Sequence, residues 1–570
     1  MHAPLSSRLV GAGLVAFLLA LAGCGGLGPG PAGTGIGIGI GDTARGLHGG
    51  SERGRIPASG PTPLFAHGLE DIRELYVEPV SIRRLAMSGL APLSRLDNRL
   101  SVNESFGFGF SDMLALRYDD RDIAVYQAPP ATDSRRWGAL LANMAAAARR
   151  TSPVLAAMSQ DNIETAVLDG MTGALDRFSH YSPPALARDQ RAARDGFGGI
   201  GVTLDTTDAA LRVTAVTPQG PAENAGIRPE DQIVAVNGVA TVGRPHQDVV
   251  RLLRGPIGSA VELKIVPAGT AQPHELRLRR ALVVLPTVTM TRAGNIAIFR
   301  ITSFNHDTTQ RIVTALAQAE RQTPHPLAGI VLDLRGNPGG LLDQAVSLDD
   351  QFIRKGPIIS TVGRHPASYQ NFTAAGDAIA PDLPIVVLIN GGSASAAEIV
   401  AAVLQDVGRA VVIGSSSYGK GTVQTVLRLP NDGDLVVTWA RLVAPSGYLL
   451  QAHGVVPTVC TAELPDDAQG LAAGLQEIAA AGPGAGPGAG LAFRPRASLD
   501  ARAWAELRQS CPPRHTSPAI DLELAEHLLA DPRLDGEALR ALPAATQLAQ
   551  GAAAGHALTD RNRTLSSPTR

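Results

Sequence analysis

Hydrophobic positions recur at helical spacing in the first third of the chain. Leu69, Ile72 and Leu75 follow one another at intervals of three, and similar spacing continues to about residue 193, as one face of a helix requires. The pattern predicts a helical N-terminal region over residues 64–195. Its middle part, residues 97–135, is less regular and is interpreted as an insertion.

Beyond the helical region the pattern changes to short runs in which apolar and polar residues alternate. Two such runs are Gln232–Val236, which Asn237-Gly238 closes, and Val261–Ile265. A period of two is typical of strands with one buried face, and one helix is predicted near Pro245 to Leu253. Residues 196–285 are therefore expected to form a small β-rich domain.

Largely apolar runs alternate with helical periods from residue 286 onward. The predicted strands are Ile296–Ile301, Gly329–Leu334, Ile385–Ile389 and Ala410–Ile413, and the predicted helices are Asp307–Gln322, Leu341–Ile353 and Ala396–Val407. Strands without polar alternation are typical of a sheet that helices cover on both faces. We expect an α/β domain over residues 286–463.

The last hundred residues carry weaker patterns. Residues 464–498 contain the low-complexity run Gly482–Pro487 and are interpreted as a linker. The tail, residues 499–570, has a short amphipathic stretch near Leu522 to Leu529 and nothing that suggests chemistry. Since a chain of 570 residues is long enough for about two to four domains, the predicted fold class is multidomain α/β.

The N-terminus has the features of a secretory signal. Arg8 precedes an apolar run from Leu9 to Leu21, which is shorter than the roughly 20 residues that a membrane-spanning helix needs. The residues Leu21-Ala22-Gly23-Cys24 resemble a bacterial lipobox, which implies cleavage before Cys24 and lipidation of its thiol. An ordinary signal peptide with a chance cysteine is the alternative.

A lipid anchor would place the chain in a bacterial cell envelope, on the periplasmic face. Residues 1–24 would be the lipoprotein signal peptide, and residues 25–63, rich in Gly and Pro, a flexible tether. Gly25, rather than Asp, follows the cysteine, which by resemblance to known lipoproteins favours the outer membrane.

Charge argues against a nucleic-acid partner. The chain has 50 basic and 52 acidic residues, a net charge of −2 and no block of like charge. Its lysines are only Lys264, Lys355 and Lys420, so arginine supplies the other 47 basic residues. Because arginine stays protonated in proteins whereas lysine can lose its proton, Lys420, which lies between two glycines, is a candidate for chemistry.

Two cysteines, Cys460 and Cys511, remain available if Cys24 is acylated. An oxidising compartment would allow a disulfide between them. Two unpaired thiols are the alternative.

Two Gly-rich turns follow predicted strands of the α/β domain. The first, Arg335-Gly336-Asn337-Pro338-Gly339-Gly340, leads into a helix. Such a turn presents backbone N–H groups at a helix N-terminus, which suits an anion or a developing oxyanion. A loop that merely needs positive φ is the alternative.

The second turn contains Ser393 and Ser395. A serine at a strand-to-helix turn is well placed as a nucleophile, but Ser395-Ala396-Ala397-Glu398 is also a capping-box pattern. The local pattern does not choose between nucleophile and cap, nor between the two serines.

The segment Gly414–Gln424 partly matches two known motifs, a phosphate loop and S-x-x-K, but its details oppose both. Gly421 stands where a phosphate loop needs Ser or Thr, and β-prone residues follow instead of a helix. The S-x-x-K match at Ser417 fails because flanking glycines oppose the helical turn which that motif needs. If Lys420 opens a strand, period two places it beside Gln424, and burial would lower its pKa toward that of a general base.

Histidines such as His180 and His306 are scattered without ligand-like spacing, and neither H-E-x-x-H nor G-x-S-x-G occurs. A metal site or a Ser-His-Asp triad therefore has little support. We expect neither a metal nor a cofactor.

Taken together, the motifs resemble those of the carboxyl-terminal processing peptidases, also called tail-specific proteases. The similarity spans Leu64 to about Val459 and rests on five motifs in the family's order: Gly199–Val202, Ala225-Gly226-Ile227 with Asp231 and Val236-Asn237-Gly238, Leu334–Gly340, the Ser395 segment, and Tyr418–Gln424. The resemblance implies a PDZ domain over residues 196–285 and a serine protease core of the ClpP/crotonase-like α/β fold over residues 286–463.

The resemblance also implies catalytic roles. The family's nucleophile lies 25 residues before its lysine, which implies Ser395 as nucleophile, Lys420 as base and Gln424 as the third member. Glu398 and Asp406 lie where some members carry supporting acids and are interpreted as structural.

Two backbone sites are implied as well. The oxyanion hole would be formed by N–H groups of Gly339, Gly340 and Ala396. In the PDZ domain, the loop formed by Gly199, Ile200, Gly201 and Val202 would bind the carboxylate of a substrate tail.

The function implied by the resemblance is a serine-type endopeptidase of the cell envelope that recognises C-terminal tails of protein substrates, with a helical-repeat adaptor lipoprotein as a possible partner. Extra residues around 97–160, and Pro457-Thr458 where the family carries Pro-Asp, are departures that leave partner docking open. A catalytically silent PDZ scaffold is the alternative. Binding of an acyl thioester, as in crotonase relatives, lacks an adenine-site signature.

Overall fold

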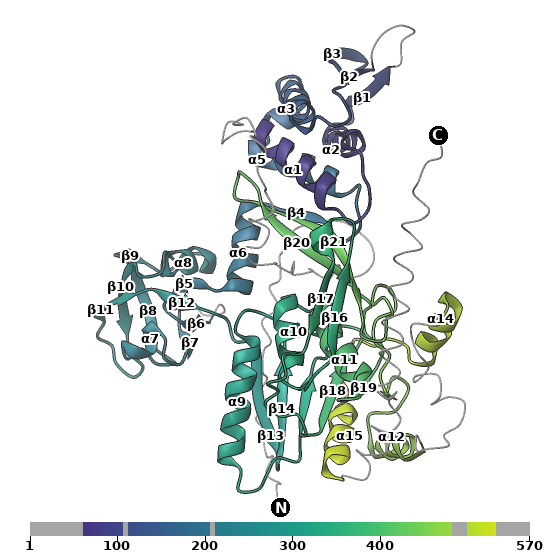
Figure 1. The fold of residues 1–570 in the computed structure, drawn as a ribbon. Helices are drawn as coiled ribbons and strands as arrows, with labels where there is room; N and C mark the ends of the chain where they lie inside the picture. The colour runs from purple at the N-terminus through teal and green to yellow at the C-terminus, as the bar shows by residue number, and fades with distance from the viewer. Residues whose placement is uncertain (1–60, 106–111, 206–210, 481–498, 532–570) are drawn as a thin grey trace, which may run out of the picture. The chain divides into compact units, whose positions relative to one another are not determined.

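The structure, a computed structural model, describes residues 61–105, 112–205, 211–480 and 499–531 (Figure 1). The expected signal peptide, Cys24 and nearly all of the tether lie outside the described residues. A helical N-terminal region, a β-rich domain and an α/β core follow one another along the chain, which is the predicted order.

The N-terminal region is mainly helical, as predicted. Its helices are α1 (Pro61–Leu75), α2 (Ile82–Leu96), α3 (Ser134–Thr151), α4 (Pro153–Ala156), α5 (Gln160–Thr172) and α6 (Pro184–Asp195). Apolar stripes, including Leu69, Ile72 and Val167, meet in one buried cluster. Helices of this kind are stable because the cluster removes those stripes from water.

The middle of this region, where the helical pattern is less regular, contains a three-stranded antiparallel sheet. Its strands are β1 (Leu100–Ser105), β2 (Met113–Tyr118) and β3 (Arg121–Gln127). Leu114 and Leu116 are buried while their neighbours are less so, and both join the helical cluster. Because this alternation has the period of a strand, the prediction of a helical region over 64–195 is corrected here.

The β-rich domain has a hydrophobic cluster of its own. Its helices are α7 (Pro221–Asn224) and α8 (His246–Leu253), and its strands are β5 (Phe197–Gly199), β6 (Val202–Leu204), β7 (Val213–Val216), β8 (Gln232–Val236), β9 (Val239–Ala240), β10 (Ala260–Val266), β11 (His274–Arg279) and β12 (Ala281–Val283). A four-stranded sheet has the order β11-β10-β8-β9, and β5 pairs with β12. Within the described part of the chain, β6 pairs with β7 alone, so one edge of β6 has no strand partner.

The centre of the α/β core is a six-stranded sheet. Its strands, in spatial order, are β13 (Val288–Ala293), β14 (Ile296–Ile301), β15 (Gly329–Asp333), β18 (Ile385–Ile389), β19 (Val411–Gly414) and β22 (Val459–Cys460). All neighbours are parallel except β13 and β14. The four predicted strands of this region are β14, β15, β18 and β19, within one or two residues at each end.

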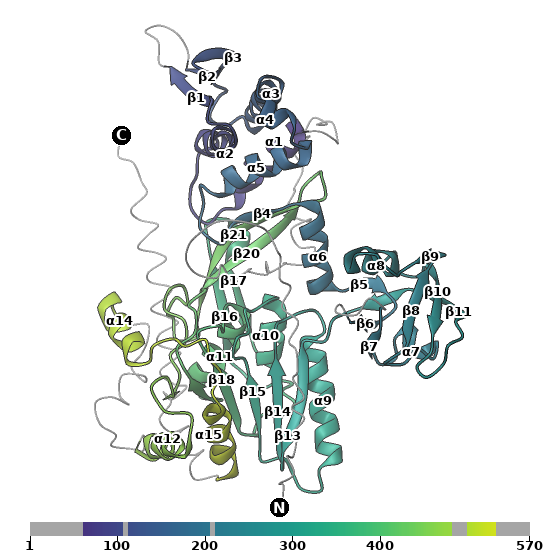
Figure 2. The ribbon, with the colours of Figure 1, turned by 180° about the vertical axis from the view of Figure 1, so that it is seen from behind.

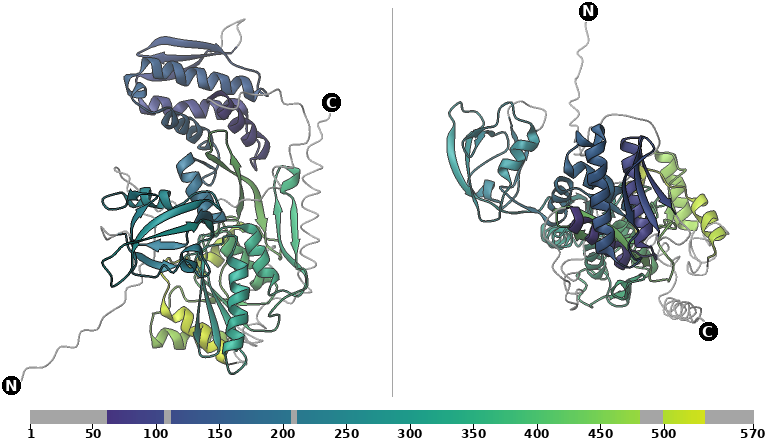
Figure 3. Two further views of the ribbon diagram at one scale, coloured as in Figure 1. Left: turned by 90° about the vertical axis from the view of Figure 1, so that its left-hand side faces the viewer. Right: turned by 90° about the horizontal axis from the view of Figure 1, so that it is seen from above.

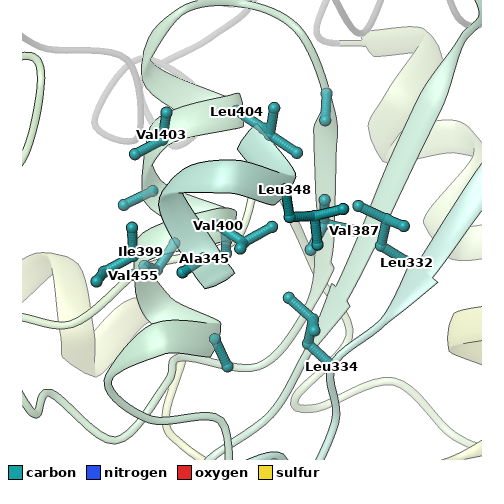
Figure 4. Packing of buried hydrophobic residues seen from close by; sticks show 14 of the residues in the cluster. Leu332, Leu334, Ala345, Leu348, Val387, Ile399, Val400, Val403, Leu404 and Val455 are labelled. Atoms are coloured by element: carbon teal, nitrogen blue, oxygen red, sulfur yellow. The ribbon is translucent and has the colours of Figure 1, made fainter. Parts of the chain in front are cut away.

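Helices cover both faces of this sheet, as the continuous apolar runs predicted. The helices of the core are α9 (Thr308–Gln322), α10 (Leu342–Asp350), α11 (Ala396–Asp406), α12 (Ala468–Ala480), α14 (Ala501–Ser510) and α15 (Ala519–Ala530). On one face, Leu332 and Val387 pack with Leu348 of α10 and Val400 of α11 (Figure 4). Figure 2 shows α9 beside β13 and β14.

A second sheet adjoins the core. It contains β17 (Gln370–Thr373), β16 (Pro357–Val362), β21 (Asp434–Val443) and β20 (Thr422–Arg428) in that order, and β4 (His180–Ser182) of the N-terminal region pairs with β21. Leu435 and Val437 of β21 join the buried cluster of the N-terminal helices. The N-terminal region therefore adds a strand to the sheet whose strand β20 begins two residues after Lys420.

The C-terminal part of the chain packs on the core, in contrast to the predicted linker and tail. Residues 468–480 of the expected linker form α12, whereas residues 481–498 lie outside the described part. Leu524 and Leu528 of α15 cover the second face of the sheet, where they pack with Val331 and Val386. Figure 3 shows the yellow C-terminal helices against the core. The Ala- and Gly-rich composition of α12 suits close packing, because a Cβ on Gly474 would lie 2.8 Å from Leu524.

A disulfide joins Cys460, the last residue of β22, to Cys511, which follows α14, with Cα atoms 5.9 Å apart. Of the two alternatives left by the sequence, the structure has the disulfide. No helix in the described ranges is both long and apolar enough to cross a membrane.

Candidate active site

The turn between β18 and α11 holds Ser395 in a strained backbone conformation. Its φ is 54° and its ψ is −117°, a region that non-glycine residues rarely adopt. Such strain is typical of a sharp strand-to-helix turn that presents a side chain at the end of a sheet. Small neighbours, Ala394, Ala396 and Ala397, allow the turn to be fully buried without the glycines of a G-x-S-x-G motif.

The two candidate serines differ in the partners of their hydroxyl groups. Ser393 Oγ donates to Leu334 O at 2.8 Å and accepts from Asn390 N at 2.9 Å, so it joins two turns. Ser395 Oγ is buried and has no hydrogen-bond partner among the described residues. Because an unengaged hydroxyl can react, the geometry favours Ser395 as the nucleophile and gives Ser393 a structural role.

The predicted capping box is present at this turn. Glu398 Oε2 accepts from Ser395 N at 2.8 Å, whereas the serine hydroxyl, which faces the N–H of Glu398, makes no hydrogen bond of normal geometry within the described residues. The same carboxylate accepts from Lys420 N at 2.8 Å on Oε2, from Gly419 N at 2.6 Å on Oε1, and from the Ser417 hydroxyl. One buried carboxylate therefore joins the turn between β18 and α11, the serine turn, to the loop between β19 and β20, the lysine loop.

The environment of Glu398 balances two effects. Burial raises the pKa of this carboxyl, and hydrogen bonds from Ser417 and the three backbone N–H groups oppose that rise. Asp406 on the same helix accepts from Ser446 N at 3.1 Å, away from the serine turn. Glu398 is thus the acid that connects the candidate residues, whereas Asp406 binds Ser446.

Lys420 is almost fully buried, with 4% of its surface exposed. Burial lowers the pKa of its ammonium group from 10.5 to about 8, although the charges of Glu398 and Asp176 raise it. Its Nζ lies 5.2 Å from the centre of the Phe178 ring. A lysine in this setting can be neutral near physiological pH, as a general base must be.

Gln424 lies on β20, which begins at Thr422, two residues later than predicted. Its Nε2 donates to Thr422 Oγ1 at 2.8 Å and to Thr438 Oγ1 at 3.1 Å. Its Oε1 is buried and has no partner among the described residues. The amide nitrogen is therefore fixed, and the amide oxygen is left to accept a hydrogen bond from an amine.

Gly339 and Gly340 lie against neighbouring backbone, which their positive φ values of 101° and 147° permit. A Cβ on Gly339 would lie 2.8 Å from Ser395 Cβ, and one on Gly340 would lie 2.1 Å from Phe304 O. No side chain can therefore occupy either position. The first Gly-rich turn is thus a close neighbour of the serine.

The N–H groups of this turn are not equivalent. Gly339 N donates to Asn337 Oδ1 at 2.8 Å, which differs from its expected role as an oxyanion donor. Within the described residues, the N–H groups of Gly340 and Ala396 donate to no acceptor. Gly340 and Ala396 are therefore the two N–H groups left to bind an oxyanion. Gly339 instead leaves room for the Ser395 side chain, because it has no Cβ.

In the β-rich domain, the predicted tail-binding loop leads into the unpaired edge of β6. Its carbonyl groups are engaged within the domain: Ile200 O accepts from Ala222 N at 2.9 Å, and Gly201 O accepts from Thr217 N at 2.8 Å. Gly199 ends β5 and Val202 begins β6. The loop is therefore held firmly next to an edge where a peptide could add as a strand.

Two side chains near the candidate residues were not predicted. Phe178 comes from the N-terminal region and faces Lys420, with Arg177 stacked 4.7 Å from its ring centre. Arg508 of α14 donates to Ser417 O at 3.0 Å. Neither belongs to a local motif, so only their tertiary contacts identify them.

The chemistry available here is that of a hydroxyl, an amine and an amide. Within the described ranges, no group of three or more His, Cys, Asp or Glu residues could hold a metal ion. A buried serine with a free hydroxyl, next to a lysine of lowered pKa and unengaged N–H groups, is suited to acyl transfer.

Comparisons with protein families match the two globular domains. Residues 295–461 match peptidase family S41, and residues 212–267 match the PDZ domain family. These ranges fall within the α/β core and the β-rich domain.

Individual relatives agree with the family match. The carboxy-terminal-processing protease of Bartonella bacilliformis is 37% identical over 331 residues, which cover 58% of this chain and 76% of that protein. CtpA of Bacillus subtilis, a carboxy-terminal processing protease, is 34% identical over 317 residues, which cover 54% of this chain and 66% of that protein. A solved structure, the photosystem II D1 C-terminal processing protease, is 25% identical with a TM-score of 0.36, covering 70% of this chain and 92% of that one. Since the Bartonella protease is 37% identical and is matched over three quarters of its length, the chain belongs to peptidase family S41, the carboxy-terminal processing proteases, and is a serine peptidase that carries a PDZ domain.

Proposed function

We propose that this peptidase is an endopeptidase of the bacterial cell envelope that binds the C-terminal tail of a substrate on its PDZ domain and cleaves with Ser395 and Lys420. One observation carries the proposal. The N–H groups of Ser395 and Lys420 donate to the same oxygen of Glu398, each at 2.8 Å. This junction supports the proposal, because it joins the backbone of a serine whose hydroxyl has no partner among the described residues to the backbone of a lysine whose pKa is about 8.

Acylation would use these groups in order. Ser395 Oγ attacks the carbonyl carbon while the neutral Lys420 amine, oriented by Gln424 Oε1, accepts the hydroxyl proton. The negative charge that develops on the carbonyl oxygen is stabilised by the N–H groups of Gly340 and Ala396. The C–N bond then breaks, and the Lys420 ammonium gives its proton to the leaving amine.

Deacylation would repeat the cycle with water. Lys420 accepts a proton from the water that attacks the Ser395 ester, and the same N–H groups stabilise the second oxyanion. When the ester bond breaks, the proton passes to Ser395 Oγ. The free carboxyl product and the starting enzyme result, with no cofactor consumed.

The PDZ domain would supply substrate selection. The loop Gly199–Val202 leads into β6, whose free edge offers backbone groups for strand addition. Backbone N–H groups at such a loop suit a terminal carboxylate, because a charged acceptor strengthens each hydrogen bond. A substrate with a free, apolar C-terminus is therefore the expected ligand.

The cellular location is also part of the proposal. Lipidation of Cys24 would anchor the chain to a membrane, and Gly25 favours the outer one. The Cys460–Cys511 disulfide supports an oxidising compartment such as the periplasm. An adaptor lipoprotein remains a proposed partner.

A cleavage assay with two forms of one substrate tests the proposal. The full-length chain in mild detergent is incubated with an unfolded protein whose apolar C-terminus is free or amidated, and fragments are identified by mass spectrometry. Amidation should lower kcat/KM about tenfold, since it removes one charged hydrogen-bond acceptor. Equal cleavage of the two forms would contradict tail recognition.

The chemical step has a matched control. Ser395→Ala should abolish cleavage of both substrate forms. Ser182→Ala removes another buried hydroxyl, in strand β4, that has no hydrogen-bond partner among the described residues, and this variant should cleave like the wild type. A Ser395→Ala enzyme that still cuts would support a different nucleophile, and a wild type that binds tails without cutting would support the scaffold.

Close packing beside Lys420 gives a separate prediction. A Cβ on Gly421 would lie 1.9 Å from Gln451 N, so Gly421→Ala must displace the lysine loop. We expect a loss of about 2 kcal/mol in the free energy of unfolding and at least about tenfold in kcat, measured by denaturant titration and by the cleavage assay.

Gly294→Ala is the control for this substitution. At Gly294, φ is 59° and no atom of the described part of the chain lies within 4 Å of an added Cβ, so only backbone strain of about 1 kcal/mol is expected and turnover should not change. Equal kcat for the two variants would show that the space beside Lys420 is not important.

A further inference from the structure

Residues 500–521, which we call the C-terminal strap, contact the lysine loop and the serine turn of the proposed active site. The strap contains helix α14 and the connection to α15. It lies beyond residue 461, where the match to the peptidase family ends. Its sequence contains no motif that indicates chemistry, so its role is inferred from its contacts.

Arg508 of the strap binds the loop that precedes Lys420. Its Nη2 donates to Ser417 O at 3.0 Å, and its Nη1 donates to His453 O. The Ser417 hydroxyl in turn donates to Glu398 Oε1. Two hydrogen bonds therefore connect the guanidinium group to the carboxylate at the centre of the site.

The backbone around this contact is shaped to admit the arginine. Gly454 has a φ of 63°, and a Cβ there would lie 2.8 Å from Arg508 Nη1, 2.7 Å from Ser417 Oγ and 3.0 Å from Glu398 Oε1. Burial lowers the pKa of Arg508, and the negative charge of Glu398 raises it. The guanidinium is thus a partly buried cation facing the buried carboxylate.

The strap also holds the serine turn. Gly391 N donates to Arg514 O at 2.6 Å, and Asn390 Nδ2 donates to Thr516 O at 2.9 Å. Asn390 Oδ1 accepts from Gly336 N at 2.7 Å, in the first Gly-rich turn. The start of the serine turn is therefore tied to the strap and, through Asn390, to the first Gly-rich turn.

A covalent bond fixes the strap to the edge of the core sheet. Cys511 follows Arg508 by three residues and is bonded to Cys460 on β22. Cys511 is 2% exposed, whereas Cys460 is only partly buried, so the core packs against one side of the bond. Without this bond, helix α14 would be held near the lysine loop by noncovalent contacts alone.

We propose that Arg508 is a positioning residue of this peptidase and that the Cys460–Cys511 disulfide keeps Arg508 in place. The inference rests on the proposed function of Ser395 and Lys420. Arg508 acts through Ser417 and Glu398 and does not touch the substrate. When the arginine contact is lost, the loop shifts and water reaches the Lys420 amine.

Kinetic measurements on the full-length enzyme test the arginine. Arg508→Met should lower kcat about tenfold, leave KM within about twofold, and move the apparent pKa of kcat upward from about 8 toward 10.5, as Lys420 is hydrated. Arg508→Lys keeps a charge but loses the planar fork of donors, so it should restore only part of the rate.

Arg502→Met is the matched control. Arg502 lies on the same helix, its side chain is 88% exposed, and it pairs with Glu506. This variant should have the wild-type kcat and pH profile. If Arg508→Met matches it in both, the inference is overturned.

The disulfide is tested in two ways. The double variant Cys460→Ser/Cys511→Ser should reproduce the kinetic change of Arg508→Met at a temperature where it remains folded. Dithiothreitol should have the same effect on the wild type: the dithiol gives two electrons and two protons, two cysteine thiols form, and the reagent becomes a cyclic disulfide. It should not affect the double variant further, and an unchanged kcat in both cases overturns the role of the disulfide.

Hydrogen exchange separates this inference from the proposed function. Arg508→Met should speed the exchange of backbone amides in residues 417–424, and Arg502→Met should not. If the wild type and Ser395→Ala cleave alike, the proposed function fails, while exchange still reports whether the strap orders the loop. Unchanged exchange in Arg508→Met overturns the inference whatever the cleavage assay shows.

Discussion

Lys420→Arg should lower kcat by about a thousandfold, because the proposed base can no longer accept a proton. Arginine keeps the positive charge, but it stays protonated at any pH the enzyme survives. The buried lysine, by contrast, has a pKa of about 8. The substitution therefore removes proton transfer while it retains the charge near Glu398.

The pH profile gives this prediction its sharpest form. Since the neutral amine is the active form, kcat/KM of the wild type should rise with pH and level off above about 8. Residual cleavage by Lys420→Arg should lack this rise. Lys264→Arg, at an exposed position on strand β10 of the PDZ domain, should keep both the rate and the profile. A rise near pH 8 in Lys420→Arg would assign the titration to another group.

The same lowered pKa predicts a gain in stability from Lys420→Met. In the unfolded chain the lysine titrates near 10.5, and in the folded chain near 8. Between these values the unfolded chain binds more protons, so wild-type stability rises with pH across this window, and below pH 8 the cost of a buried ammonium is fully present. Lys420→Met should thus melt at a higher temperature than the wild type at pH 7, and this advantage should shrink at pH 10.

Glu398→Gln should lower kcat by about a hundredfold, because the serine turn and the lysine loop lose their common acceptor. An amide offers one oxygen where the carboxylate offers two. Either the N–H groups of Ser395 and Lys420, or that of Gly419 with the Ser417 hydroxyl, would then face an NH₂ group. A buried donor left without an acceptor also destabilises the fold, by about 1–3 kcal/mol.

The pH profile distinguishes a positioning role from simple unfolding. The charge of Glu398 raises the pKa of Lys420, so its removal should move the rise in kcat/KM to lower pH. Glu164→Gln is the control: Glu164 is a buried carboxyl of α5 that accepts a hydrogen bond from Gln160, and its substitution should leave turnover unchanged. If Glu398→Gln loses stability but keeps kcat and the profile, the carboxylate has only a structural role.

Local pattern was sufficient for much of the fold. The apolar runs that became β14, β15, β18 and β19 are buried on both faces, so continuous hydrophobicity identified them without any partner. The reverse holds for the segment around Leu114 and Leu116, where strand alternation inside a helical region was interpreted only as irregularity. The error arose because two buried positions are too few to distinguish one period from another.

The C-terminal segments show a different limit. Composition made residues 464–498 look like a linker, yet Gly474 of α12 packs on Leu524 of α15, and both helices cover the sheet. Whether small residues form a linker or a close helix contact depends on what lies opposite them. That information is absent from the segment itself.

Residue type and spacing alone predicted the order of the domains and the strands and helices of the core. They also predicted a serine turn, a Gly-rich turn and a single lysine between glycines, and the family that these motifs resemble. These features are local, because each depends on residue type and spacing within about 20 positions. The tertiary structure decided which serine has a free hydroxyl, that Gly339 donates to Asn337, that Glu398 joins the two turns, and that Phe178 and Arg508 reach the site. Such contacts join residues far apart in the chain, and only the packing of one element on another brings their atoms together.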